Sequence, residues 1–311
     1  MLKKITLISV VMLCLSGISS LFANPAYIPQ SGIVSVKLHH INSDPGVSWL
    51  LTSWKNSDRE SNLRDFVKTI NFDTMGVSVL PSNNSSVREM LLVIEVGGSD
   101  YDFNTLRRII QENPDTPVLE QQFQGNTIYY ANNELNDYDA FSVVDGTILI
   151  GTSLKAVEQG LGKTSYTETK QYEDASKQIS DDKDIIIFAD NKNLQFAKFL
   201  EPLQDKWRLT LLLSADSLEW IGYSFDVLNS DSISGQIVFK GSNANNLDDV
   251  IDDANFIGEA FKRKFMAEKI SYTSDVTVNN TYVTLTFESK GLEPLWIRLF
   301  EKGVMSVIKP Q

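Results

Sequence analysis

Apolar and polar positions follow two spacings along the chain, and these predict an alternation of strands and helices. Val34, Val36 and Leu38 alternate with polar residues, a period typical of a strand with one aliphatic face. Residues 246–265 carry an apolar stripe at helical spacing, with acidic residues in the first turn and basic residues in the last. Further strands are predicted over residues 72–80, 90–96, 119–123, 128–130, 141–144, 148–150, 185–189, 220–228, 233–240, 276–278 and 282–287. Further helices are predicted over residues 47–54, 63–70, 103–111, 154–161, 194–203 and 292–302.

Particular residues predict where these elements turn or end. Gly125-Asn126 and Asp145-Gly146 predict tight turns of β-hairpins, because both dipeptides readily adopt positive φ angles. Asp102 is expected to cap the helix over residues 103–111. Gly162 is expected to end the helix over residues 154–161. Pro202 is expected to interrupt the helix over residues 194–203.

The order of predicted elements recurs in the two halves of the chain. Each half gives a strand, a helical region, two strands, a helix, paired strands and a final helix. We interpret this as an α+β fold made of a tandem pair of similar modules, each an antiparallel sheet with helices on one face. The alternative is one continuous α+β domain. The predicted organisation is a signal peptide (1–23), a first module (24–163), a polar linker (164–183) and a second module (184–311).

The first residues have the pattern of a secretory signal. Lys3 and Lys4 precede an almost unbroken apolar run over residues 5–15, and Ala23 offers a small residue for cleavage. Retention of this segment as a membrane anchor is the alternative. The only cysteine, Cys14, lies inside it, so a cleaved chain has no disulfide and no thiolate ligand. We therefore expect export to the periplasm or cell envelope of a bacterium.

Charge and composition narrow the classes of partner. The 311 residues include 28 basic and 40 acidic ones, for a net charge of −12. Nucleic-acid-binding proteins usually present a basic surface, so this balance argues against such a role. It also disfavours anionic lipid surfaces, and membrane contact is left open without being predicted.

Candidate catalytic and metal-binding groups are sparse. His39 and His40 are the only histidines, and adjacent strand residues point to opposite faces, so they are poorly placed to share a metal ion. The acidic pairs Asp248-Asp249 and Asp252-Asp253 are interpreted as the solvated face of a helix. The sequence therefore predicts no catalytic residue, no metal site and no cofactor.

One run of residues carries a resemblance. The segment DAFSVVDGTILIGTS over residues 139–153, followed by a short helix, is similar to a hairpin-plus-helix pattern in uncharacterised secreted bacterial proteins that contain domains of unknown function. The resemblance covers about 25 residues. It implies export and a repeated α+β fold, and it implies no reaction and no catalytic residue.

Two apolar helical segments are the candidates for contact with a partner or ligand. Trp49 and Trp54 lie in the first, and Leu295, Trp296 and Phe300 lie in the second. Packing in the protein core is the alternative use of these side chains.

The favoured hypothesis is an exported, non-catalytic envelope protein that binds a protein or peptide partner. The alternative is a periplasmic carrier of an apolar ligand, such as a lipid, held between sheet and helices. A hydrolase that uses Asp, Glu and one His ranks lowest.

Overall fold

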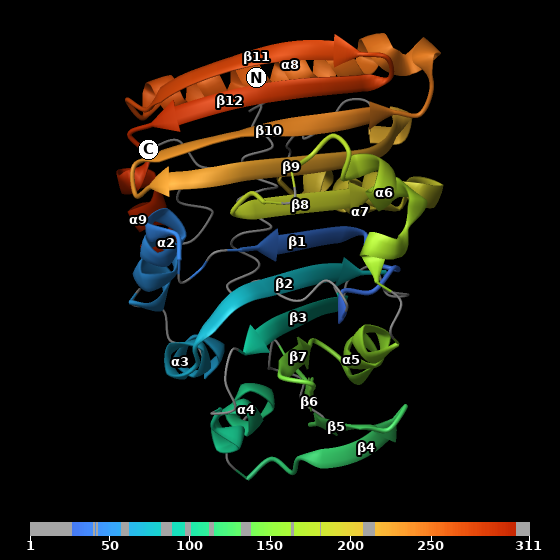
Figure 1. Cartoon of the computed structure of the whole chain (residues 1–311), viewed down its shortest axis with the longest axis vertical. Coiled ribbons are helices and arrows are strands. Elements are labelled where there is room, and N and C mark those ends of the chain that lie inside the picture. Colours follow the sequence, from blue (N-terminus) through green and yellow to red (C-terminus); the bar gives the residue numbers. More distant parts are fainter. Residues whose placement is uncertain are drawn as a thin grey trace. The chain divides into compact units, whose positions relative to one another are not determined.

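The fold combines helices with antiparallel strands (Figure 1). The computed structural model describes residues 27–39, 41, 43–56, 62–81, 89–96, 101–111, 115–131, 138–162, 165–180, 182–207 and 215–302. The predicted signal peptide and Cys14 lie outside these residues. All strand pairs within the compact units described below are antiparallel. The chain is thus an α+β protein, as predicted.

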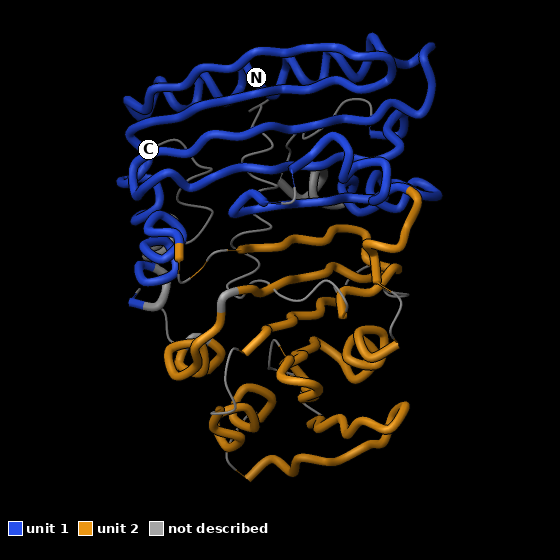
Figure 2. The backbone as a smooth tube through the Cα atoms, in the orientation of Figure 1, with its two compact units in different colours: residues 1–19, 44–57, 171–311 blue, residues 20–43, 58–170 orange. Residues whose placement is uncertain are grey.

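The chain divides into two compact units (Figure 2). Among the described residues, unit 1 draws on residues 44–57 and 171–311, and unit 2 draws on residues 20–43 and 58–170. Residues 44–57 therefore belong to unit 1, although the segments that flank them in the sequence belong to unit 2.

Unit 1 contains five described strands in the order β11-β12-β10-β9-β8. These strands are β8 (Ile185–Asp190), β9 (Leu218–Asn229), β10 (Ser232–Gly241), β11 (Ser271–Asn279) and β12 (Tyr282–Lys290). Its helices are α2 (Pro45–Lys55), α6 (Lys170–Ala175), α7 (Gln195–Trp207), α8 (Leu247–Ala267) and α9 (Glu293–Lys302), with short 3-10 helices η3 (Lys192–Leu194), η4 (Ala215–Ser217) and η5 (Ala244–Asn246).

Unit 2 contains seven described strands in the order β1-β2-β3-β7-β6-β5-β4. These strands are β1 (Val34–Leu38), β2 (Phe72–Leu80), β3 (Glu89–Val96), β4 (Leu119–Phe123), β5 (Asn126–Tyr130), β6 (Ala140–Val144) and β7 (Thr147–Gly151). Its helices are α3 (Asn62–Thr69), α4 (Phe103–Ile110), α5 (Leu154–Leu161) and the 3-10 helix η2 (Tyr166–Glu168).

The prediction that helices cover one face of each sheet is wrong for unit 2. On α5, a Cβ at Gly160 would lie 2.7 Å from the Leu149 side chain, so this helix covers the face that carries Leu149. On α4, the Phe103 ring packs edge-on against Phe141 at 5.5 Å. Phe141 pairs with Ile150, the neighbour of Leu149, and successive strand residues point to opposite faces. The two helices therefore cover opposite faces.

The same correction applies to unit 1. A Cβ at Gly258 of α8 would lie 3.3 Å from Leu285 of β12. Asp174 of α6 instead accepts a hydrogen bond from Tyr282 of the same strand. Tyr282 and Leu285 are three residues apart and so point to opposite faces. In Figure 1, α8 accordingly runs behind β11 and β12, whereas α6 lies in front of the sheet.

Burial on both faces explains why β3 and β8 carry continuous apolar runs. Residues 91–94 of β3 and residues 185–189 of β8 are at most 3% exposed. A strand that is solvated on one face would show alternating burial instead. None of the helices among the described residues is both long enough and apolar enough to span a bilayer.

Local signals placed two helix ends correctly, whereas the interpretations of Pro202 and Asp253 are wrong. Asp102 caps α4 by accepting a hydrogen bond from the Asn104 amide at 2.9 Å, and Gly162 is the C-cap of α5, as predicted. Helix α7, however, continues through Pro202 to Trp207, because the cost of one proline can be outweighed by tertiary packing. Asp253 of α8 is fully buried, so the interpretation of the acidic pairs as a wholly solvated face is wrong at this position.

Candidate functional site

The two helices predicted to contact a partner lie against each other in unit 1. Helix α2 contacts both α9 and β9. Trp49 is half-buried on α2, whereas Leu295 and Trp296 of α9 are 1% and 4% exposed. The side chains of Trp54 and Phe300 lie outside the part of the chain that the structure describes. The two helices are therefore in contact, and a partner contact by these residues stays a prediction.

Strand β11 is a second candidate, and the strand order places it at the end of the unit 1 sheet. It pairs with β12 over nine residues, from Ser271 opposite Lys290 to Asn279 opposite Tyr282, without a register shift. No further strand pairs with its other side among the described residues. Most of its residues are exposed, including Val278 at 47%. An end strand of this kind presents a row of backbone donors and acceptors.

The hairpin turn indicates which backbone groups of β11 point outward. Asn280 and Thr281 form a two-residue connection between β11 and β12, so Asn279 and Tyr282 form its closing hydrogen-bonded pair. In an antiparallel ladder, hydrogen-bonded and non-hydrogen-bonded pairs alternate. The N–H and C=O groups at positions 272, 274, 276 and 278 therefore point away from β12, toward the free side of β11.

Helix α8 supports this edge from one face. The Tyr272 ring of β11 packs edge-on against Phe265 at 5.4 Å and against Phe261 at 5.9 Å. Burial raises the pKa of the Tyr272 hydroxyl to about 12. A Cβ at Gly258 would lie 3.3 Å from the Ser274 hydroxyl, so α8 approaches the strand closely. The edge is thus held in an extended conformation before any partner binds.

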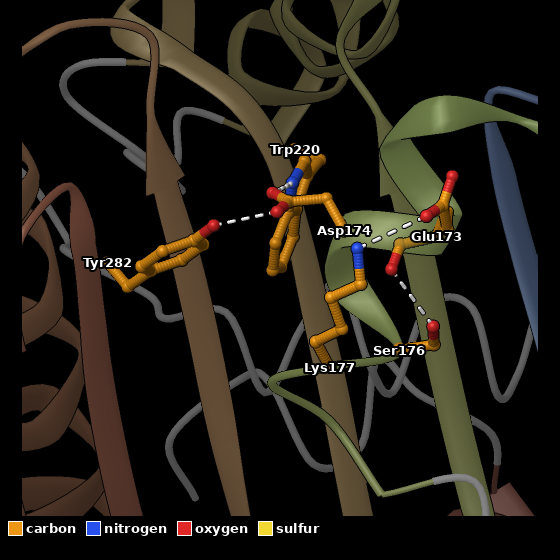
Figure 3. Close-up of polar contacts among 6 residues, drawn as sticks. All are labelled: Glu173, Asp174, Ser176, Lys177, Trp220 and Tyr282. Atoms are coloured by element: carbon orange, nitrogen blue, oxygen red, sulfur yellow. Dashed lines mark hydrogen bonds and ion pairs between the residues drawn. The ribbon is translucent and has the colours of Figure 1, made fainter.

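A cluster of aromatic and polar side chains holds the turn end of the same hairpin from the opposite face (Figure 3). The Asp174 carboxylate of α6 accepts hydrogen bonds from Trp220 Nε1 at 3.0 Å and from the Tyr282 hydroxyl at 2.7 Å. The Lys240 ammonium lies 4.0 Å from the centre of the Tyr282 ring. Burial raises the pKa of Tyr282 to about 12, and Asp174 and Glu219 add to the effect. Both carboxylate oxygens of Asp174 therefore accept hydrogen bonds from the sheet, and these bonds hold α6 on β9 and β12.

A partly buried carboxyl group lies in unit 2, at the start of β6. Burial raises the pKa of Asp139 to about 6, and its Oδ1 atom has no hydrogen-bond partner among the described residues. Its backbone is paired with Gly151 and Ala131 on either side. The side chain is therefore fixed in a place that disfavours its charge.

Replacing Asp139 with asparagine is expected to stabilise the protein at pH 7.5. A carboxyl whose pKa is higher in the folded chain than in the unfolded chain lowers stability as the pH rises from about 4 through about 6. The variant should gain about 1 kcal/mol at neutral pH, allowing for solvent screening, and nothing at pH 4. Urea unfolding followed by circular dichroism at the two pH values measures this. The exposed Glu120→Gln change is the control, and an equal effect of Asp139→Asn at both pH values would contradict the assignment.

Sequence reasoning found part of the edge and missed its support. It predicted a strand only over residues 276–278, whereas β11 begins at Ser271. The available signal was the spacing of Tyr272, Val276 and Val278, which all lie at even positions among polar residues. Nothing local pointed to Asp174, because its partners are 46 and 108 residues away in the sequence.

Searches for similar proteins yield no assignment. No family model, no curated protein and no solved structure matches the chain. Within the described ranges, no group of three or more His, Cys, Asp or Glu side chains is arranged to hold a metal ion.

Proposed function

We propose that the chain is an exported, non-catalytic protein of a bacterial envelope that binds a protein partner through β11. An extended segment of the partner would add to the sheet as a further antiparallel or parallel strand. The observation that carries this proposal is the regular nine-residue edge of β11, with outward backbone groups that no described strand pairs.

The composition of β11 supports binding at this edge. Proteins usually protect exposed edges with proline, lysine, bulges or short strands. β11 contains neither proline nor lysine, and its pairing with β12 has no bulge. The end strand of unit 2, β4, differs: it has only five residues, and Pro117 stands two positions before it. The edge of β11 is thus the less protected of the two.

Tight contact between helices and sheets favours this function over the apolar carrier. Gly258 lets α8 approach Leu285 more closely than a methyl group would allow without adjustment, and Gly160 does the same for α5 at Leu91 and Leu149. A carrier of an apolar ligand would need several hundred cubic ångströms of open volume between the helices and the sheet. The close approach leaves little room at these two places.

Export and internal duplication complete the proposal. Export is supported by the positive and apolar pattern of residues 1–23. Duplication is supported by strand order: β8-β9-β10-β12-β11 in unit 1 corresponds to β1-β2-β3-β7-β6 in unit 2, with β4 and β5 as an additional hairpin. In each unit a helix also follows the second strand of the last hairpin, namely α9 or α5.

The Val276→Pro variant is expected to lose partner binding and to keep the fold. Proline at this position removes an outward N–H group and leaves the ladder to β12 intact. A photoreactive amino acid at position 277 should form an adduct with the partner in the envelope fraction of the native host. Val276→Pro should reduce this adduct at least about tenfold, since it removes a backbone hydrogen bond and places a ring at the interface.

Two controls separate backbone pairing from other effects. Val276→Thr keeps both the N–H group and the β-branched shape, so its adduct should be reduced far less than that of Val276→Pro. A photoreactive group at Lys262, on the exposed side of α8, should give no adduct. Tryptophan fluorescence reports the fold of unit 1, because all five tryptophans lie in its residue ranges. Equal adducts from the proline and threonine variants, or no adduct at position 277, would contradict the proposal.

A further inference from the structure

Strand β11 carries a single charged side chain, at its centre. Asp275 is exposed and lies between Thr273 and Thr277 on the face of the sheet opposite α8. It stands opposite Thr286 of β12, which supplies no charge. Among the described residues Asp275 makes no ion pair, whereas Glu288 on the neighbouring strand is paired with Lys290 at 2.9 Å. The carboxylate is thus uncompensated within the described part of this face.

The register places this carboxylate where it would lie closest to a side chain of an added strand. Asp275 belongs to a hydrogen-bonded pair with β12, so it occupies a non-hydrogen-bonded position toward a partner strand added in the antiparallel direction. Side chains that face each other across such a position come closer than at the hydrogen-bonded positions. An opposite charge there is stabilising, and a like charge is destabilising.

The other face of the edge has a different chemistry. Val276 and Val278 point toward the α8 side, and Val278 is 47% exposed. An added strand would therefore meet aliphatic side chains at alternate positions, and threonine and carboxylate at the positions between them. The binding surface consequently distinguishes the two faces of an incoming strand.

Resting on the proposed strand addition, we infer that the partner segment is an extended peptide with alternating apolar residues and a basic residue facing Asp275. The apolar residues of the segment lie on the α8 side, beside Val276 and Val278. The lysine or arginine lies on the opposite face and supplies the missing counter-charge. The same carboxylate selects against segments that carry an acidic residue at this position.

Synthetic peptides test this inference on the purified protein. The probe is a nine-residue, amidated peptide that carries a fluorophore at its N-terminus, alternates threonine and valine, and has lysine at its centre. A second peptide has glutamate there instead. Fluorescence anisotropy at low salt should show the lysine peptide binding about threefold to fivefold more tightly, and the difference should shrink at roughly 0.5 M salt.

Substitutions at Asp275 assign the preference to this side chain. Asp275→Asn should abolish the difference between the peptides, and Asp275→Lys should reverse it. Val276→Pro should weaken both peptides equally. Equal affinity for the two peptides, or a lysine preference that survives Asp275→Asn, overturns the inference and leaves strand addition standing. Failure of both peptides to bind, or binding insensitive to Val276→Pro, overturns strand addition itself.

Discussion

The Gly46→Ala variant is expected to lose at least about 3 kcal/mol of stability in unit 1. Gly46 lies in the first turn of α2, where Asp44 accepts a hydrogen bond from its amide at 2.7 Å. A Cβ at this position would overlap the carbonyl oxygen of Val227 and lie 2.8 Å from the carbonyl carbon. Both atoms belong to the backbone of β9, which cannot move aside as a flexible side chain can. The helix must therefore lift from the sheet or lose its cap.

Gly241→Ala is the matched control. A Cβ at Gly241, at the end of β10, would meet its nearest neighbours at 3.6 Å, an ordinary van der Waals distance. This variant should change stability by no more than about 1 kcal/mol. Urea unfolding followed by tryptophan fluorescence compares the two, because the tryptophans all belong to unit 1. Similar midpoints for both variants would show that α2 does not lie against β9 as described.

Much of the local structure could be predicted because its causes are local. The hairpin turn at Asp145-Gly146 requires positive φ at both residues, and the angles are 48° and 74°. Asp102 and Gly162 mark helix ends because their caps form within a few residues. The apolar stripe on α8 could likewise be predicted, because its spacing depends only on the period of one helix with one buried face.

The arrangement of these elements could not be predicted in the same way. The continuous apolar run Leu91–Ile94 indicates burial on both faces, but nothing in the run says which helices provide it. The membership of α2 in unit 1 depends on its contacts with β9 and α9, which are far away in the sequence. The burial of Asp253 could not be predicted either, because a charged residue is expected to be exposed when only its sequence is considered.

The candidate edge site follows from topology in particular. The alternating residues of β11 resemble any half-exposed strand, and only the strand order reveals that this strand lies at the end of its sheet. Asp275 then acquires its proposed role through register, which fixes its pairing with Thr286 and its position on the free side. A one-residue shift would have moved the carboxylate to the α8 side.

The Trp220→Ala variant is expected to lose about 3–5 kcal/mol of stability. Trp220 is fully buried, and its ring lies 6.2 Å from Phe188 and 6.1 Å from Tyr282. Truncation leaves a large cavity between the sheet and α6, and it also removes the indole N–H group that donates a hydrogen bond to Asp174. Urea unfolding of the variant measures the loss.

Comparison with two further variants separates packing from hydrogen bonding. Trp220→Phe fills most of the cavity and should cost only about 1–2 kcal/mol, mainly through the lost hydrogen bond to Asp174. Because of that bond, Trp220→Phe should cost clearly less in an Asp174→Ala background, where the carboxylate is already absent. Equal costs in both backgrounds would mean that Asp174 and Trp220 act independently. Since Asp174 also holds Tyr282 at 2.7 Å, its removal should loosen the turn end of the hairpin and weaken binding at β11.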